Sequence, residues 1–256
     1  MTLAAQRTRA LLEQAWLPIL LIVIWYFASA ASTNPFLPPL SRIWESFLVE
    51  LTTGDLIAHT VASMRNIVAG LFLGVVVGIV VGIAIGKSRA LRSILNPYLQ
   101  FARSVPQVAL VPIIIGALGI TALPKIWAIA FACIWPVLLN TVDGVRAIDP
   151  GVRDLVKSYR IGTRLELFKV VLPAALPQMM AGMRISLSVA VVVMVVSEIY
   201  GATEGIGYFI NYSKGLFQPE STWMGTLLVG LLGYLLSVLF LVIEKRALHW
   251  YHASAE

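Results

Sequence analysis

Two charged side chains, Arg184 and Glu198, lie within one long apolar stretch of the sequence, residues 177–200. A charge at membrane depth is costly, so it usually marks a solute pathway or pairs with another helix. Because 14 positions separate these two residues, they lie about 21 Å apart along a helix and cannot pair with each other. Two hypotheses follow. Either both line the route of a polar solute, with Arg184 meeting an anion, or both reach neighbouring helices and the membrane interfaces.

Residues suited to catalysis or metal binding form no known motif in this sequence. There is no nucleophile elbow, His-Glu-x-x-His, Walker A loop or Gly-x-Gly-x-x-Gly after a strand. His59, His249 and His252 lie at or outside the ends of apolar stretches, so we expect no histidine pair to hold a metal within the membrane. The single cysteine, Cys133, has no disulfide partner. We therefore predict no catalytic residue, no metal site and no cofactor in this chain.

The composition argues against a water-soluble enzyme. Of 256 residues, 59% are hydrophobic and 12% charged, whereas an average soluble domain is about 25% charged. Six stretches reach or approach the roughly 20 apolar residues that cross a bilayer as a helix. They are about 16–32, 61–86, 105–120, 125–143, 177–200 and 221–243. We predict an all-α fold, a polytopic membrane bundle of six transmembrane helices, with residues 1–256 as one transmembrane domain.

The basic residues are unevenly distributed along the chain, whose net charge is +6. Fourteen of the nineteen Lys and Arg residues fall in the two tails and in the second and fourth loops. Since short cytoplasmic loops are enriched in Lys and Arg, this distribution predicts that both termini are cytoplasmic. Topology accounts for the positive charge, and we expect no nucleic-acid partner.

A row of glycines marks the second apolar stretch. Gly70, Gly74, Gly78, Gly82 and Gly86 are each four residues from the next. In a helix such a row forms a groove about 24 Å long, along which other backbones can approach closely. We predict that these glycines form a packing face and that this helix is central to the bundle.

Prolines and a short polar segment mark two further regions. Pro106 and Pro112 predict a bend in the stretch 105–120, which either lines a pathway or is a kinked packing helix. In the external segment 33–60, a short amphipathic helix starting near Ser41 and a simple connector are both compatible with the sequence.

The loop at residues 144–175 is too long and too patterned for a simple turn. Asp149 followed by Pro150 predicts a helix start. Apolar residues then recur at helical spacing, at Val152, Leu155, Val156 and Tyr159. Thr163 and Glu166 match a capping box for a second short helix that Pro173 ends. Two amphipathic helices with basic residues suit either docking to another protein or lying on the membrane.

This loop resembles the coupling loop of the membrane-spanning permease subunits of ATP-binding-cassette importers, whose signature is Glu-Ala-Ala, then Gly, then Leu-Pro. The similarity extends over nearly the whole chain and is closest to the nitrate, taurine and alkanesulfonate branch. The segments that carry it are 154–160 (DLVKSYR), 161–177 (IGTRLELFKVVLPAALP), 34–41 (NPFLPPLS), 140–150 (NTVDGVRAIDP), 182–185 (GMRI), 197–201 (SEIYG) and 205–208 (GIGY), besides the glycine-rich second stretch.

The loop also departs from the family pattern. Asp154 replaces the glutamate, Leu155 and Val156 replace the two alanines, and Arg160 stands at the glycine position. Arginine does not take a positive φ cheaply. We therefore predict that Gly162, two residues later, makes the break between the loop helices instead. The docking geometry would then be shifted, or the partner ATPase co-adapted.

The resemblance implies a type I importer fold in a bacterial inner membrane, and a set of partners. Two permease copies would form a homodimer around the pathway, two ATPase subunits carrying ATP and Mg would clamp the loops, and an extracytoplasmic binding protein would deliver the solute. Coupling residues would be Asp154, Tyr159, Arg160, Gly162, Leu165, Phe168, Leu172 and Pro173. Pathway residues would be Gln107, Asn140, Arg184, Ser188 and Glu198. The outer segment 201–218 is a candidate gate or receptor contact.

Two rival interpretations remain compatible with a membrane bundle. One is a secondary transporter driven by protons or sodium, although the sequence shows no internal repeat. The other is a membrane scaffold that docks cytoplasmic partners without transport. For the importer, the branch and the intramembrane Arg184 favour a small anion, such as nitrate, a sulfonate or taurine, bicarbonate or a carboxylate.

Overall fold

The computed structural model describes residues 3–32, 34, 36–52 and 54–253, and over these residues it consists of helices and their connections. The elements are α1 (Leu3–Ser29), α2 (Leu40–Thr52), α3 (Leu56–Lys87), α4 (Arg89–Ser104), η1 (Gln107–Leu110), α5 (Val111–Leu118), α6 (Ala122–Arg146), α7 (Pro150–Ser158), α8 (Thr163–Glu166), η2 (Leu167–Val171), α9 (Leu172–Tyr200), α10 (Ile206–Gly215), α11 (Pro219–Ala247) and α12 (His249–Ala253). The all-α class predicted from the sequence is confirmed.

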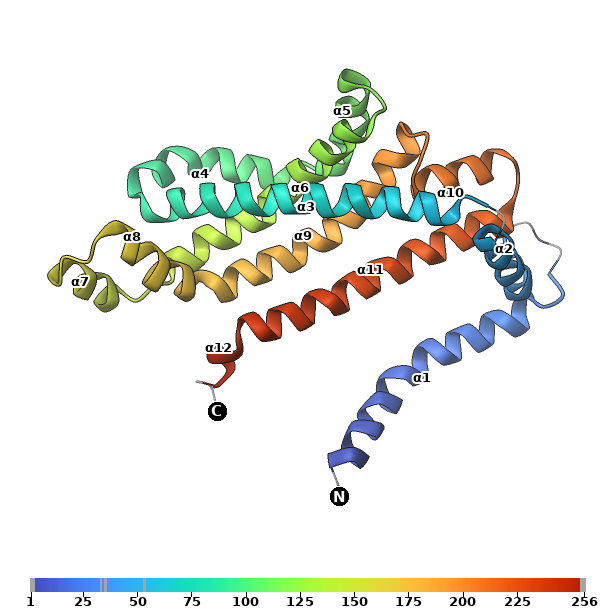
Figure 1. Cartoon of the computed structure of the whole chain (residues 1–256), viewed down its shortest axis with the longest axis horizontal. Coiled ribbons are helices and arrows are strands. Elements are labelled where there is room, and N and C mark those ends of the chain that lie inside the picture. The colour runs from blue at the N-terminus through green and yellow to red at the C-terminus, as the bar shows by residue number, and fades with distance from the viewer. Residues whose placement is uncertain (1–2, 33, 35, 53, 254–256) are drawn as a thin grey trace.

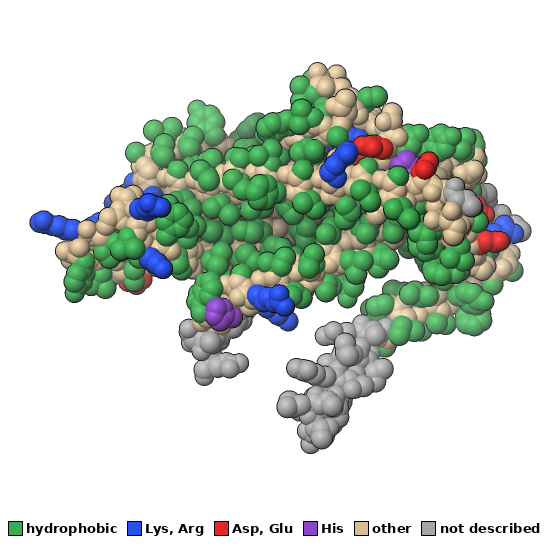
Figure 2. Space-filling view, in the orientation of Figure 1, with side chains coloured by type: hydrophobic (Ala, Val, Ile, Leu, Met, Phe, Trp, Pro, Cys, Tyr) green, Lys and Arg blue, Asp and Glu red, His purple; other side chains and the backbone are tan. Residues whose placement is uncertain are grey.

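Four helices in the described part of the chain are long and apolar enough to cross a membrane, namely α3, α6, the helix Thr163–Tyr200 and α11. A further pair, α4 with the segment Gln107–Leu118, meets this criterion only as two arms bent by 81°. The apolar part of α1, Trp16–Ser29, is a shorter helix. Figure 2 shows hydrophobic side chains over the middle of the molecule and charged ones mainly toward its ends, as a membrane environment requires.

The centre of the molecule is formed by α3, α6 and α9, which run side by side in Figure 1 and share the most extensive helix contacts. The five glycines of α3 face a row of α6 residues that is also spaced by four: Ile129, Cys133, Val137, Thr141 and Val145. A Cβ placed on Gly74 would lie 2.7 Å from Cys133 Cβ and 2.8 Å from the Ala130 carbonyl oxygen. The two helices are therefore parallel and in close backbone contact along the whole glycine row.

The two ends of the molecule carry different elements. In Figure 1, α7 and α8 project at one end, whereas α2 and α10 lie at the opposite end. The free ends of α1 and α11 point away from the end that carries α2 and α10.

The stretch 105–120, expected to be one span, is not a continuous helix. Val105 is extended, Pro106 follows it, and α5 begins only at Val111 with Pro112 in its first turn. A proline disfavours the helical conformation of the residue before it and cannot donate a backbone hydrogen bond. The bend expected from the prolines is confirmed, and it separates two helical arms, α4 and the segment Gln107–Leu118. The basic residues assigned to a loop lie on α4 instead: Arg89, Arg92 and Arg103.

The external segment contains the helix α2, so the helical alternative is confirmed. Ile43 of α2 is buried in a cluster with Leu56, Phe209 and Met224. This cluster joins α2 to the start of α3, to α10 and to α11, and it closes the end of the bundle that carries α2 and α10.

The glycine row makes a testable prediction about stability. We expect Gly74→Ala to destabilise the protein by about 1 to 3 kcal/mol, because the added methyl meets backbone and Cβ atoms of α6. Gly230→Ala on α11 is the matched control, since a Cβ there has no atom within 4 Å. It should be neutral or stabilising by up to about 1 kcal/mol, because alanine favours a helix. Thermal unfolding of both variants in detergent measures the difference, and equal midpoints would contradict the packing assignment.

Candidate functional site

The projecting loop begins with α7, whose start follows the sequence prediction. The Asp149 carboxylate accepts hydrogen bonds from the backbone N–H groups of Gly151 at 2.7 Å and Val152 at 3.3 Å. Pro150 occupies the first turn, where its missing N–H costs nothing. The predicted N-cap is therefore confirmed, and it fixes the direction in which α7 leaves α6.

The break between the two loop helices lies at Arg160 through Gly162. Arg160 has a φ of 50°, so it takes the left-handed conformation that we expected it to avoid, and that expectation is wrong. Gly162 has a φ of −61° and a ψ of 146°, which is extended and places it as the N-cap of α8. The Arg160 N–H donates to the Lys157 carbonyl at 3.0 Å and the Ile161 N–H to the Val156 carbonyl at 3.0 Å, and these turn hydrogen bonds hold Arg160 in place.

The second loop helix differs from the expectation in two respects. Thr163 lies inside the first turn and makes no side-chain cap, so the predicted capping box is wrong. Pro173 does not end the helix, because the chain stays helical from Thr163 to Tyr200 through a π-helical turn at Leu167–Val171. The wider turn sits where Pro173 cannot donate to the residue four positions earlier. The second helix of the projecting loop is thus continuous with α9.

Contacts to the helix core anchor the projecting loop. Lys87 Nζ at the end of α3 lies 3.0 Å from a carboxylate oxygen of Glu166. The Arg153 guanidinium donates to the carbonyl oxygens of Val145 at 2.7 Å and Arg146 at 3.2 Å. These contacts hold α7 and α8 against the ends of α3 and α6.

The outer surface of the loop is apolar where the coupling residues were predicted. Tyr159 is 76% exposed and Phe168 57% exposed, and Leu165 is exposed between them. Asp154 is also exposed and lies 3.6 Å from Lys157, while Leu172 and Pro173 are partly buried. A hollow of about 540 Å³ lies at the start of α8, lined by Gly162, Thr163, Arg164, Leu165, Phe168 and Lys169. Large exposed apolar side chains beside a hollow and charged groups can receive a protruding partner surface.

The hydrogen bonds and ion pairs of the described residues join predicted pathway residues to other groups, not to one another. Asn140 accepts a hydrogen bond from the Gln178 amide at 3.0 Å and donates to the Pro136 carbonyl at 2.8 Å. Ser188 is exposed on α9. Gln107 lies at the start of the segment Gln107–Leu118, where its amide donates to the Ala102 carbonyl at 3.4 Å.

Arg184 has a partner on another helix. Its guanidinium donates two hydrogen bonds to the carboxylate of Glu244 on α11. The Glu244 side chain is largely buried, whereas that of Arg184 is about half exposed. This contact supports the second hypothesis for Arg184, in which its side chain reaches a neighbouring helix.

Glu198 lies in a buried polar cluster at the outer end of the core. Its carboxylate accepts from the Ser63 hydroxyl at 2.8 Å and from the Gly207 N–H at 2.9 Å. Ser63 in turn accepts from the Ile206 N–H at 2.8 Å, and His59 accepts from the Gly205 N–H at 3.2 Å. We call the six residues His59, Ser63, Glu198, Gly205, Ile206 and Gly207 the outer cluster. Lys125 of α6 is also buried and interacts electrostatically with Glu198.

Sequence reasoning missed the α3 side of the outer cluster. His59, Ser63 and the buried Asn66 occupy positions i, i+4 and i+7 of α3, and Asn66 precedes Gly70 by four residues. The polar stripe therefore continues the glycine row on nearly the same helix face. Polar residues at helical spacing in an otherwise apolar span were the available signal.

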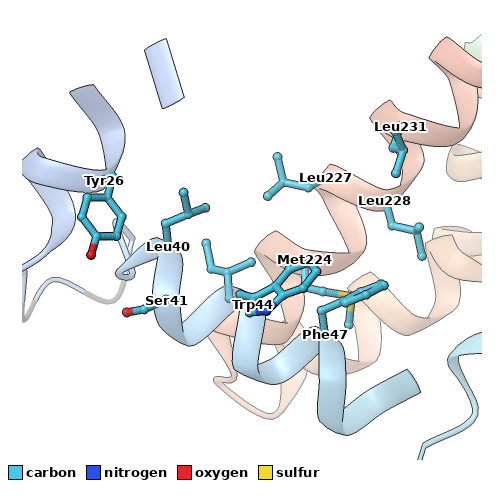
Figure 3. Close-up of a pocket in the computed structure, with 10 residues that line it drawn as sticks. Tyr26, Leu40, Ser41, Trp44, Phe47, Met224, Leu227, Leu228 and Leu231 are labelled. Atoms are coloured by element: carbon cyan, nitrogen blue, oxygen red, sulfur yellow. The ribbon is translucent and has the colours of Figure 1, made fainter. Parts of the chain in front are cut away.

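A separate apolar groove of about 500 Å³ lies between α1, α2 and α11. Figure 3 shows its lining side chains, which include Tyr26, Leu40, Ser41, Trp44, Phe47, Met224, Leu227, Leu228 and Leu231. Apart from the hydroxyls of Tyr26 and Ser41 and the indole N–H of Trp44, the lining is apolar. A polar solute finds few ligands there, so we assign this groove no part in a polar pathway.

Comparison with known proteins identifies relatives of the whole chain. The family described as binding-protein-dependent transport system inner membrane component matches residues 74–249. SsuC of Escherichia coli (strain K12), named for aliphatic sulfonates transport, is 32% identical over 92% of this chain and 90% of its own. The taurine transport system permease TauC of the same organism is 30% identical over 92% and 88%. The bicarbonate transport system permease CmpB of Synechococcus elongatus is 29% identical over 84% and 81%.

Solved structures share the fold. A chain of the MetNI methionine transporter, in an inward-facing conformation, superposes with a TM-score of 0.65 at 20% identity, over 77% of this chain and 98% of that one. A chain of an amino acid ABC transporter gives a TM-score of 0.58 at 14% identity, over 78% and 95%. The expectation of a type I importer fold is confirmed.

The left-handed residue of the loop makes a prediction. Arg160→Gly should stabilise the loop by about 1 kcal/mol, because glycine takes a positive φ without the steric cost that other residues carry. Arg164→Gly, four residues later and inside α8, is the control and should destabilise by about 1 kcal/mol, because glycine weakens a helix. Hydrogen exchange of residues 150–168 measures both effects. Equal effects of the two substitutions would show that Arg160 carries no strain.

The contact between Arg184 and Glu244 predicts coupling between the two sites. In a double-mutant cycle of Arg184→Gln and Glu244→Gln, the coupling energy should be about 1 kcal/mol, because each single variant leaves one charge unpaired. Lys245→Gln, at the next position of α11, is the control and should combine additively with Arg184→Gln. Thermal unfolding in detergent supplies the free energies. Additivity in both cycles would count against a structural bridge.

Proposed function

The chain belongs to the family of binding-protein-dependent transport system inner membrane components, and from this premise we propose how its parts divide the work of import. It is a permease of an ATP-binding-cassette importer, a multi-pass protein of the inner membrane with ATPase and binding-protein partners. The proposals below concern the loop that receives the ATPase, the enclosure of the pathway, the orientation and the solute.

The loop at residues 150–173 docks the ATPase subunit. The observation that carries this proposal is the exposure of Tyr159, Leu165 and Phe168 on a loop that ion pairs and hydrogen bonds fix to the core. Exposed apolar side chains on a rigid support can transmit force as well as bind, since little of the motion is lost in bending. ATP and Mg bind to the partner, which carries out hydrolysis, and this chain supplies no cofactor site.

A second copy of the chain encloses the pathway, giving a homodimer. Ser188 and Gln178 are exposed in the single chain, and Asn140, which accepts a hydrogen bond from Gln178, is partly buried. Such polar groups are unfavourable against lipid tails but suit a solute route between two copies. Gln107 and Ser188 are pathway residues in this arrangement. Arg184 and Glu198 act by holding helices in place, since both have protein partners.

The docking loop and both termini face the cytoplasm, and the end with α2 and α10 faces the binding protein. This orientation is supported by the basic residues of the loop and of α4, since cytoplasmic segments are enriched in Lys and Arg. The outer segment at residues 201–218 then lies where a binding protein delivers solute and where a gate would close.

The solute is a small anion of the sulfonate, taurine, bicarbonate, nitrate or carboxylate class. The relatives TauC and CmpB are named for taurine and bicarbonate, which supports this class. Arg184 does not add support, because Glu244 already neutralises it. Selectivity therefore rests mainly with the binding protein, and the permease supplies a polar route.

ATP binding drives transport by shifting the bundle between two packings. Closure of the ATPases pulls the two docking loops together, and the state with closed loops gains their binding energy. Because the loop continues into α9 without interruption, its displacement reaches the centre of the bundle.

Uptake into proteoliposomes tests this function. The permease is reconstituted with its ATPase and binding protein, and uptake of labelled taurine and bicarbonate is measured with and without ATP. Phe168→Ala should lower ATP-driven uptake at least about 10-fold, because large anchor side chains dominate docking energy. Phe72→Ala, the same truncation at an exposed side chain in the middle of α3, is the control and should leave uptake unchanged.

Uptake that continues without ATP and collapses with the proton gradient would overturn the importer mechanism. Equal losses for the two phenylalanine variants would place the ATPase contact elsewhere on the chain.

A further inference from the structure

Three consecutive backbone N–H groups at the start of α10 are bound by side chains of other helices. The N–H groups of Gly205, Ile206 and Gly207 donate to His59, Ser63 and Glu198 respectively. The N-terminus of α10 has no side-chain cap of its own. Three of the four orphan donors of this helix start are therefore satisfied by α3 and α9.

The charge and shape of the outer cluster suit this arrangement. A carboxylate at a helix N-terminus interacts favourably with the helix dipole, and Glu198 is only 1% exposed, so water screens this interaction little. Gly205 has a φ of 114°, and a Cβ there would meet the Glu198 carboxylate. A Cβ on Gly207 would lie 2.6 Å from the Val195 carbonyl oxygen. Backbone and carboxylate can approach this closely only because both residues are glycines.

A second charge contact ties the same segment to α3, but it is of a different kind. Arg65 Nη2 lies 2.7 Å from Glu204 Oε1, and the two side chains are 55% and 46% exposed. Exposed ion pairs contribute little to stability, whereas a buried charge with several hydrogen bonds is costly to disrupt. Of the charged contacts that hold α10, the outer cluster is therefore stronger than this surface pair, and it acts beside the apolar packing of Phe209 on Ile43, Leu56 and Met224.

The outer cluster and the docking loop are attached to the same rigid unit. The helix Thr163–Tyr200 spans 38 residues, about 57 Å, and carries the loop at one end and Glu198 near the other. The loop is also bound to the ends of α3 and α6, and Ser63 lies on α3. The glycine row packs closely on α6, and Gly182 of α9 packs closely on Pro136 and Asn140 of α6, so α3, α6 and α9 are held together as one unit.

We propose that Glu198 is a positioning residue that fastens α10 to the core of α3, α6 and α9, so that α10 moves with the docking loop as one body. The outer segment would then follow each displacement that the ATPases impose on the loop, without a separate signal. This inference rests on the proposed docking of the ATPase at residues 150–173.

Hydrogen exchange of the permease–ATPase complex, with and without Mg-ATP, tests the attachment. In Glu198→Ala the amide of Gly207 should exchange about 10- to 100-fold faster than in the unmodified protein, because its charged acceptor is lost. The amide of Ile206 should also exchange faster, because its acceptor Ser63 is no longer held by the carboxylate. Glu198→Gln keeps an acceptor oxygen and should restore part of the protection. Glu204→Gln, the same change at the exposed carboxylate of this segment, is the matched control and should leave these amides unchanged.

The nucleotide response separates positioning from general stability. In the unmodified complex, Mg-ATP should change exchange both in residues 150–168 and in residues 206–215. In Glu198→Ala the loop should still respond while α10 does not. Ser63→Ala keeps the carboxylate and removes one hydroxyl, and it should also show a response of the loop without a response of α10. It replaces Glu198→Ala in the experiment if that variant does not fold.

Two outcomes would overturn the inference, and they are distinguishable. If α10 of both variants responds to Mg-ATP as in the unmodified complex, Glu198 does not couple it to the loop. In the second outcome, exchange in residues 150–168 of the unmodified complex does not change with Mg-ATP, although the amides of Ile206 and Gly207 are protected there and lose this protection in Glu198→Ala. The contacts of the outer cluster are then correct, but the docking proposal fails.

Discussion

Backbone-to-backbone packing of α3 on α6 is the contact on which the rest of this structure depends. Lipid tails are as apolar as leucine side chains, so helices in a membrane gain little by hiding apolar surface from lipid and must associate by close packing. Five glycines at intervals of four provide that packing over about 24 Å of helix. The same contact sets the two helices in parallel register. It therefore fixes both ends of the core. At one end Lys87 contacts Glu166 of the docking loop, and at the other Ser63 donates to Glu198 within the outer cluster.

The docking loop shows how local strain and helix continuity combine. Arg160 takes a left-handed conformation that suits glycine better, at a cost of roughly 1 to 2 kcal/mol. The turn hydrogen bonds around it and the anchoring of α7 through Arg153 hold it there. Beyond the break, a π-helical turn lets Pro173 lie within a helix instead of ending it. As a result the loop is the end of a long helix, and a push on its exposed apolar side chains acts directly on the core.

Charged groups in the apolar part of the molecule follow one rule. Arg184 pairs with Glu244 of α11, and Glu198 accepts hydrogen bonds from Ser63 and the backbone of α10. In surroundings of low dielectric constant an unpaired charge is far more costly than in water, and both of these residues have a partner on another helix. These charges consequently act as fasteners between elements. The groups left available to a passing solute are neutral and polar, which is consistent with a route that conducts without binding tightly.

The sequence by itself determined the membrane class, the helical fold, the packing role expected of the glycine row, the start of α7 and the presence of helices in the loop at residues 144–175. Composition, helical periodicity and capping residues are local properties, so they can be read without knowing what the chain packs against. Only the tertiary structure decided the partners of Arg184 and Glu198, which lie 60 and 135 residues away in the sequence. It also decided the 81° bend that replaces the third span and the left-handed conformation of Arg160. The prolines predicted a bend but not its angle, and the partners of Arg184 and Glu198 depend on contacts between distant segments, which no local spacing of residues encodes.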